Sequence, residues 1–534
     1  MRARRVLAIP LYPLAFASIV VATTLSPRVQ ADTDPKALLS SKCMACHLPN
    51  GEGKLNRIDQ SRRTPEGWDM TIGRMIAAHG VSLTGDERQI LVKYLADTHG
   101  LAPDETAGRR YILEREFTQV ETPDDKRVAE TCARCHSYAR IALQRRTPED
   151  WRKLANFHVG QYPTIEIQQA GRDRDWWKIA SEEMPKRLGK LYAFNAPVWD
   201  RWLATQKSSA QGSWRVVGHR PGWGAYEGAA TISADGADKY SVKMDVRYAN
   251  GKSEHGEGKG VVYTGFEWRA AMKLGDLDTR QVFELSPDGK NLKGRWHVDN
   301  VDSIGGEFEA VRVGNDSPAQ ILLVEPRAIK VASTARINIY GSHLTGDIKL
   351  GDGLRLIKVI EQNADKVVLE VEAKPGSKNG VRSVVVGSAQ VTDALAIYDK
   401  IDHLSIEPDT AMARVGGNGG ARPKVPVQFE AIAYAKGAGE QGEAVRLGYF
   451  NATWSVKNLN ANADAMEDAK FAGAMQSDGL FVPGEAGPNP ARKYHTNNAG
   501  ELNVIAVVDD GGHEVKASKP LIVTVQRWND PPIR

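Results

Sequence analysis

The chain has 534 residues, a quarter of them charged, and a formal net charge of +4. A chain this long exceeds what one hydrophobic core supports, so we expect three or four domains. The nearly balanced charge lacks the basic footprint of nucleic-acid-binding proteins, which excludes nucleic acid as the main partner.

The first 31 residues have the three parts of a secretory signal peptide. Three arginines precede an apolar run over residues 8–22, and small residues then lead to an A-x-A-like sequence that ends at Ala31. The run is short for about 30 Å of hydrocarbon and two prolines interrupt it, which argues against a membrane anchor. We therefore expect cleavage after Ala31 and export to the periplasm. The leader contains four arginines and no acidic residue, so its removal lowers the net charge from +4 to about zero.

All four cysteines stand in two C-x-x-C-H motifs. The motifs are Cys43-Met44-Ala45-Cys46-His47 and Cys132-Ala133-Arg134-Cys135-His136. This is the attachment pattern of haem c, in which the thiols bond to the haem vinyl groups and the histidine becomes the proximal iron ligand. A zinc site would need four close ligands and a dithiol oxidoreductase a βαβ pattern, and neither is apparent. No cysteine remains for a disulfide or for a cysteine-derived cofactor.

The two motifs belong to an internal repeat. Residues 62–68 read R-R-T-P-E-G-W and residues 145–151 read R-R-T-P-E-D-W, each downstream of its own C-x-x-C-H. Thr-Pro-Glu is a helix start, with threonine as N-cap, proline at the first helical position and an acid in the first turn. We therefore predict a helical di-haem cytochrome c domain over 32–205, built from two repeats over about 32–105 and 106–205. Apolar spacing predicts a further helix near 86–94.

The repeat also indicates the sixth iron ligands. Met75 and His158 stand at the same distance after Trp68 and Trp151, and both residue types bind haem iron. The prediction is His47 and Met75 for the first iron, and His136 and His158 for the second. Met70, His79 and His99 compete with Met75, with His79 as its main rival, and Met184 competes with His158. Methionine ligation raises the potential, so electrons are expected to pass from the second haem to the first.

The paired arginines of the repeat have two interpretations. They either bind the haem propionates or are solvated residues at a helix start. The residues concerned are Arg62, Arg63, Arg145 and Arg146.

After about residue 205, alternation and turn signals replace the helical pattern. Apolar residues alternate over 240–248 before Asn250-Gly251, so we predict an antiparallel β-barrel-like domain over 206–316. Similar alternation predicts an immunoglobulin-like β-sandwich over 317–400, and a second one over 401–534 that ends in an extended tail. The fold class is thus multidomain α + β. Histidines are scattered in these β domains, and we predict no catalytic residue in the chain.

The duplicated motifs, followed by three β domains, resemble the alpha subunit of quinohemoprotein amine dehydrogenase over the whole mature chain. The resemblance implies two haems c held by Cys43, Cys46, Cys132 and Cys135. It also implies a heterotrimer with a beta-propeller subunit and a small subunit that carries cysteine tryptophylquinone and oxidises primary amines to aldehydes. Electrons would then reach a small periplasmic copper protein or cytochrome c. This chain would carry electrons and leave the substrate chemistry to its partner.

Two other interpretations stay open. A self-contained di-haem enzyme such as a peroxidase needs one iron with an open or displaceable sixth position. A di-haem cytochrome scaffold would use its β domains to bind another redox enzyme or a polymer.

Overall fold

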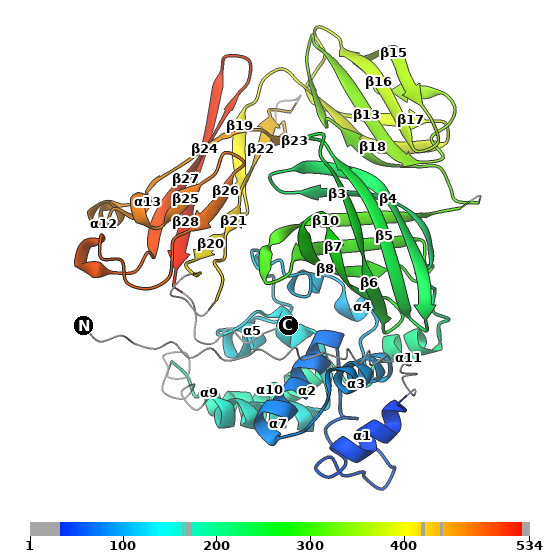
Figure 1. The fold of residues 1–534 in the computed structure, drawn as a ribbon, viewed down its shortest axis with the longest axis vertical. Coiled ribbons are helices and arrows are strands. Elements are labelled where there is room, and N and C mark those ends of the chain that lie inside the picture. Colours follow the sequence, from blue (N-terminus) through cyan, green and yellow to red (C-terminus); the bar gives the residue numbers. More distant parts are fainter. Residues whose placement is uncertain are drawn as a thin grey trace, which may run out of the picture.

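The computed structural model describes residues 33–162, 165, 173–314, 316–417, 422–437 and 442–525. The predicted leader and the tail over 528–534 lie outside these described residues. A helical region comes first and β domains follow, which confirms the expected order (Figure 1). In the described part of the chain, no helix has both the length and the apolar character that crossing a membrane requires.

The helical region consists of short helices around two hydrophobic cores, one containing Trp68 and the other Trp151. Its α-helices are α1 (Pro35–Cys43), α2 (Pro65–His79), α3 (Gly85–Thr98), α4 (Pro103–Thr106), α5 (Lys126–Cys132), α6 (Ala139–Ala142), α7 (Pro148–Gln161), α9 (Trp176–Lys178), α10 (Met184–Leu191) and α11 (Pro197–Ala204). Two other helical turns are η1 (Arg110–Ile112) and the π-helical η3 (Ile179–Glu183).

Both predicted helix starts are confirmed. The Thr64 hydroxyl accepts a hydrogen bond from the backbone N–H of Gly67 at 3.2 Å and so caps α2. Thr147 caps α7 in the same way, by accepting from the N–H of Asp150 at 3.2 Å. The helix predicted near 86–94 is α3, whose apolar face joins the first core. Capping residues and apolar spacing within the sequence therefore determine the helices on which the candidate iron ligands Met75 and His158 lie.

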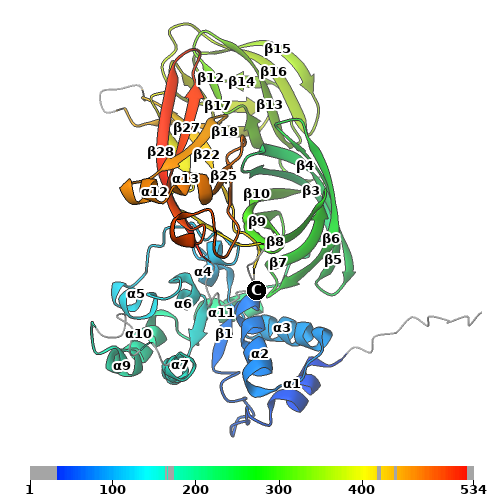
Figure 2. The same cartoon turned by 60° about the vertical axis from the view of Figure 1, so that its left-hand side comes forward.

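A two-stranded ribbon joins the two halves of the helical region, which are the first lobe around Trp68 and the second lobe around Trp151 (Figure 2). Strand β1 (Ser61–Arg63) pairs antiparallel with β2 (Gln144–Arg146), and Arg62 lies opposite Arg145. Because Arg62 and Arg145 are the same position of the repeat, the lobes meet about an approximate twofold axis.

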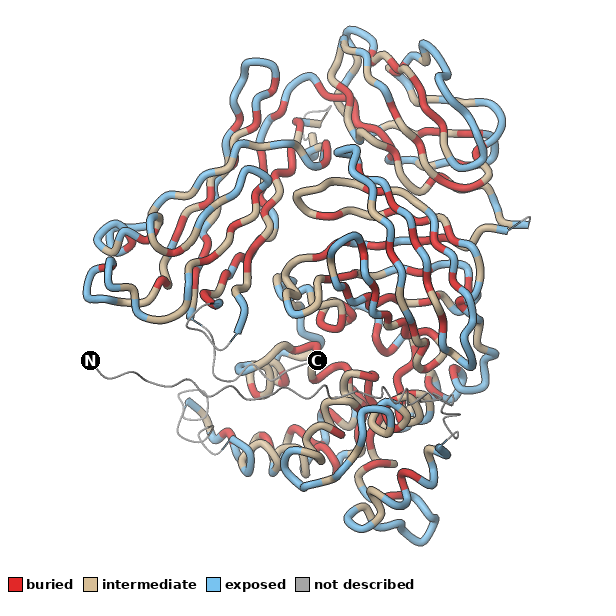
Figure 3. The backbone as a smooth tube through the Cα atoms, in the orientation of Figure 1, coloured by how far each residue is buried: buried red, intermediate tan, exposed pale blue. Residues whose placement is uncertain are grey.

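The second domain is a closed eight-stranded barrel, as the prediction of a barrel-like domain required. Buried and exposed positions alternate along its strands (Figure 3), and the alternation predicted over 240–248 is confirmed. Large aromatic side chains fill the interior, with Phe283 stacked on Phe308 at 4.1 Å between ring centres. The strands are β3 (Gly212–Arg220), β4 (Gly224–Gly236), β5 (Lys239–Tyr248), β6 (Ser253–Tyr263), β7 (Glu267–Leu274), β8 (Leu277–Leu285), β9 (Asn291–Val298) and β10 (Val301–Val313).

The third domain has two four-stranded sheets that share one core. The first sheet has the order β11-β13-β16-β15 and the second β12-β18-β17-β14, in which β12 and β18 run parallel. The strands are β11 (Gln320–Glu325), β12 (Ala328–Lys330), β13 (Thr334–Ser342), β14 (Ile348–Leu350), β15 (Leu354–Gln362), β16 (Lys366–Ala373), β17 (Gly380–Val386) and β18 (Ala389–Tyr398).

The fourth domain combines three small sheets around another core. Their orders are β19-β22-β23, β20-β28-β27-β24 and β21-β26-β25. The elements are β19 (His403–Glu407), β20 (Ala411–Arg414), β21 (Val427–Gln428), β22 (Glu430–Ala435), β23 (Val445–Phe450), β24 (Thr453–Asn458), α12 (Ala461–Ala465), α13 (Asp468–Phe471), β25 (Gly473–Met475), β26 (Leu480–Pro483), η4 (Lys493–His495), β27 (Gly500–Asp509) and β28 (Glu514–Thr524).

The barrel contacts both the helical region and the fourth domain. Arg110 donates to Glu267 across the first contact at 2.7 Å. His219 of the barrel lies 2.8 Å from a carboxylate oxygen of Glu430 across the second. The helical region, the β domains and the segments between them enclose a cavity of about 3300 Å³.

Candidate haem sites

The second C-x-x-C-H motif lies where α5 ends, and its histidine faces a second histidine. The ring centres of His136 and His158 are 6.5 Å apart. His136 uses Nδ1 for a hydrogen bond with the carbonyl of Ser137 at 3.0 Å, and His158 does the same with the carbonyl of Leu154 at 2.8 Å. Both imidazoles are thus oriented through Nδ1, which leaves Nε2 for a metal.

This pair fits a haem iron held from both sides. Metal–imidazole bonds are about 2 Å long and a ring centre lies roughly 1 Å behind its nitrogen, so two axial imidazoles need centres about 6 Å apart. Burial lowers the pKa of His136 to about 4 and also lowers the pKa of His158. Both rings are therefore neutral near pH 7, which is the form that binds metals.

Met184, the competitor for the second iron, has a different position. Its side chain is 2 % exposed and packs in the lobe core with Val128 and Leu188. This is the ordinary use of methionine as a core residue.

The first motif forms the expected tight turn. The backbone N–H groups of Cys46 and His47 both donate to the carbonyl of Cys43, at 3.2 and 2.9 Å. His47 Nδ1 lies 2.9 Å from the carbonyl of Asn56, which orients the ring as in the second motif. The two cysteines and the histidine therefore stand on one turn, the arrangement that haem attachment needs.

The other candidate ligands of the first iron differ in the contacts that their side chains already make. Both ring nitrogens of His99 already have partners, Asp59 at 2.8 Å and Thr98 at 2.9 Å. The Met70 sulfur lies 3.5 Å from an Arg140 nitrogen of the other lobe. Met75 and His79 are left on α2, one helical turn apart, where Met75 is half-buried and His79 is exposed.

The four arginines of the repeat are buried, so the solvated alternative is wrong. Arg62 forms a bidentate pair with Glu105 at 2.7 and 2.9 Å, and Arg145 donates to the same carboxylate at 2.9 Å. Arg146 pairs with Asp150. Two of the four arginines thus share one acid that sequence reasoning missed, because Glu105 carries no motif and lies far from both in the chain.

Arg63 is the exception among the four. Its Nη1 donates to the Thr71 hydroxyl at 2.6 Å and its Nη2 to the Ser61 hydroxyl at 3.3 Å, while Nε has no partner among the described residues. Its guanidinium also lies over the Trp68 ring at 5.1 Å. This side chain therefore stays available for a further anion.

A zinc centre finds no support in the described residues, because nowhere among them do three His, Cys, Asp or Glu side chains gather as metal ligands. A cofactor attached at the two motifs is the chemistry that these residues fit.

Four family models match consecutive segments of the chain. They describe the alpha subunit of quinohemoprotein amine dehydrogenase: its haem-binding part matches residues 33–199, domain II 207–313, domain III 318–399 and domain IV 404–533. Together with the fold and the two motifs, they define a haem-binding subunit of an oxidoreductase complex. The chain belongs to the family of quinohemoprotein amine dehydrogenase alpha subunits.

Comparisons with single proteins add little. No curated protein matches the chain. A redesigned beta barrel, mFAP1 bound to DFHBI, is similar to 20% of this chain over 94% of its own length, with 12% identity and a TM-score of 0.18. Drosophila N-cadherin EC1-3 is similar to 50% of this chain over 85% of its own length, with 11% identity and a TM-score of 0.20. Likenesses this small carry no argument about function.

Proposed function

We propose that this chain is the di-haem electron-transfer subunit of a periplasmic amine dehydrogenase. The observation that carries the proposal is the His136–His158 pair, with ring centres 6.5 Å apart beside one of two haem-attachment motifs, in a chain of this family. A haem bound there stores and releases one electron at a time.

Each predicted site residue has a role in this proposal. Cys43 and Cys46 hold the first haem and Cys132 and Cys135 the second, each by covalent bonds. His47 and Met75 are the proposed ligands of the first iron, and His136 and His158 those of the second. If both residues of each pair bind, neither iron would keep an open position for substrate, and the chemistry supplied there would be electron transfer.

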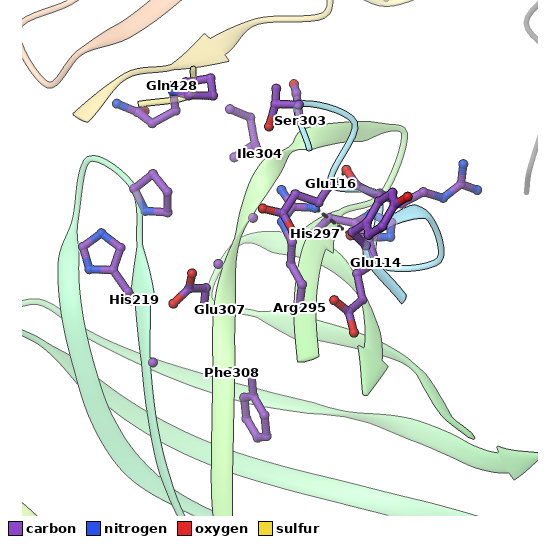
Figure 4. A pocket seen from close by; sticks show the side chains of 18 of the residues that line it. Glu114, Glu116, His219, Arg295, His297, Ser303, Ile304, Glu307, Phe308 and Gln428 are labelled. Atoms are coloured by element: carbon purple, nitrogen blue, oxygen red, sulfur yellow. Dashed lines mark hydrogen bonds between the residues drawn. The ribbon is translucent and has the colours of Figure 1, made fainter. Parts of the chain in front are cut away.

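The electron donor is proposed to dock at the large cavity. Cys135, His136 and Arg140 line it together with residues of the barrel and the fourth domain. Figure 4 shows one wall, where Glu114, Glu116 and Glu307 lie near Arg295. A redox partner seated there would lie next to the second haem. This favours electron entry at the second haem.

For the partners, we propose those that the resemblance to the family implies. The donor would be a small subunit with cysteine tryptophylquinone that oxidises primary amines to aldehydes, and a beta-propeller subunit would complete the heterotrimer. A small periplasmic copper protein or cytochrome c would accept the electrons.

We further propose the leader over 1–31, the cytochrome domain over 32–205, the barrel domain over 206–316, and immunoglobulin-like folds for 317–400 and 401–534.

An amine-reduction experiment tests the function. The native complex is purified without oxygen and oxidised, and a simple primary amine is added while haem absorption is followed. We expect prompt haem reduction that disappears when the small quinone-bearing chain is removed. Haems that dithionite reduces but no amine reduces would contradict the proposal. Carbon monoxide binding to the intact protein would then favour the self-contained enzyme.

A further inference from the structure

Five arginine side chains lie where the two lobes meet, and the carboxylate of Asp150 pairs with two of them. Arg57 and Arg146 both pair with Asp150, and the side chains of Arg63, Arg74 and Arg140 lie in the same cluster. In the described part of the chain, none of these last three has a carboxylate within ion-pair distance. The junction thus carries positive charge that its own acids do not balance.

The repeat explains why Arg63 lacks an acid. Arg63 and Arg146 are equivalent, and both guanidinium groups lie over the tryptophan of their own lobe, at 5.1 and 5.4 Å. Arg146 pairs with Asp150, but the position equivalent to Asp150 in the first lobe is Gly67. Arg63 is 7 % exposed, and burial, followed by the charge of Arg146, holds its pKa well below the usual value. A buried guanidinium of this kind needs an anion from elsewhere.

Arg74 and Arg140 reach the junction from opposite lobes. Arg74 on α2 lies over the ring of Phe157 on α7 at 5.1 Å, and Phe157 directly precedes His158. Arg140 on α6 stands four residues after His136 in the sequence, and its Nη2 lies 3.5 Å from the Met70 sulfur. Each of these contacts is made across the boundary between the lobes. The cluster therefore lies beside the proposed ligands of the second iron.

We infer that Arg63, Arg74 and Arg140 form a binding site for the propionate carboxylates of the second haem. The inference rests on the proposed function in one respect, namely that a haem is attached at Cys132 and Cys135. Guanidinium groups bind carboxylates through paired hydrogen bonds, and such pairs are strongest where water is excluded. The first lobe would thereby hold the haem of the second, and α2 would connect the two redox centres.

The site has an electrostatic consequence that can be measured. Positive charge beside the propionates disfavours the oxidised, more positive state of the iron and so raises the potential of the second haem. Removing one arginine leaves a propionate charge unbalanced and stabilises the oxidised state. The potential of the second haem should then fall, while that of the first changes less.

The test compares Arg140→Gln with Arg152→Gln in the complete complex. Arg152 is exposed on α7, six residues before His158. Its replacement therefore removes the same positive charge as Arg140→Gln does, but from a position in contact with solvent. Potentials of both haems are measured by optical and EPR titration. We expect Arg140→Gln to shift the equilibrium of the second haem up to tenfold toward the oxidised form, which is 59 mV, and Arg152→Gln to have little effect. Equal shifts in the two variants, no shift, or a shift of the first haem alone would overturn the inference.

Two further measurements test the inference even if Arg140→Gln does not fold: one on Arg140→Lys and one on the unmodified protein. Lysine keeps the charge but loses the planar fork, so part of the potential should return. In the unmodified protein, haem with ¹³C-labelled propionates should show ionised carboxylate bands in infrared spectra below the ordinary carboxyl pKa of about 4.3. Bands that protonate at the ordinary value would count against the site. These measurements use no amine. A negative result for the arginine site would therefore leave the proposed amine reaction untouched, and a failure of the amine reaction would not contradict the arginine site.

Discussion

Arg62 and Arg145 lie directly opposite each other in the β1–β2 ribbon, and both guanidinium groups are buried. Two like charges at one position of a ribbon repel unless an acid lies between them. Glu105 supplies that acid, with Arg62 on both of its oxygens and Arg145 on one. One carboxylate therefore joins the two halves of a duplicated domain at their approximate twofold axis.

Glu105→Gln should destabilise the helical region strongly. Breaking a buried ion pair by removing one partner costs about 3–5 kcal/mol, because the remaining charge stays buried. Urea unfolding followed through haem absorption measures this cost for the haem region. Asp104→Asn is the matched control, since Asp104 is the exposed neighbour of Glu105. Equal stability of the two variants would show that Glu105 does not join the lobes.

The same carboxylate predicts acid sensitivity. Burial by itself would raise the pKa of Glu105, but the hydrogen bond from Arg62 and the charges of Arg145 and Arg62 outweigh it and lower the pKa. A lowered folded-state pKa contributes stability above the unfolded value of about 4.3, and this contribution is lost as pH falls through the folded value. The stability of the unmodified protein should therefore drop below about pH 4.3. Glu105→Gln should show a smaller drop, and parallel pH profiles of unfolding would contradict this account.

Local sequence patterns predicted much of this structure, whereas contacts between residues far apart in the chain could not be predicted. Thr64 and Thr147 start their helices as their own neighbours require, and the alternation over 240–248 marks a barrel strand. The repeat placed His158 at a position that faces His136. The burial of Arg62 and Arg145 could not be predicted, because their partner Glu105 comes from a short helix whose own sequence shows no functional pattern.

His158→Ala should open the second iron to external ligands. The substitution removes one of the two facing imidazoles, so carbon monoxide should bind to the reduced protein, whereas the unmodified protein should not bind it. Absorption spectra under carbon monoxide measure this. His99→Ala is the control, since both nitrogens of His99 are engaged by Asp59 and Thr98. Binding in the control but not in His158→Ala would remove His158 from the ligand set.

Met75→Ala and His79→Ala should separate the two candidates for the first iron. If methionine is the ligand, Met75→Ala opens that iron to carbon monoxide, while His79→Ala leaves the spectrum unchanged. The two residues stand on one helix, so each variant controls for general damage to α2. The opposite result would assign His79, and two histidine ligands at each iron would follow.

The direction of electron flow depends on the same ligands. Methionine at the first iron raises its potential above that of a haem with two histidines, so the second haem should be the lower of the two. The cavity lined by Cys135 and His136 would give a donor access to a haem attached at the second motif, which agrees with this order. The arginine site inferred above would raise the potential of the second haem and so reduce the difference between the two potentials. Separate redox titrations of the two haems should find the first higher, and a lower first haem would contradict the predicted route.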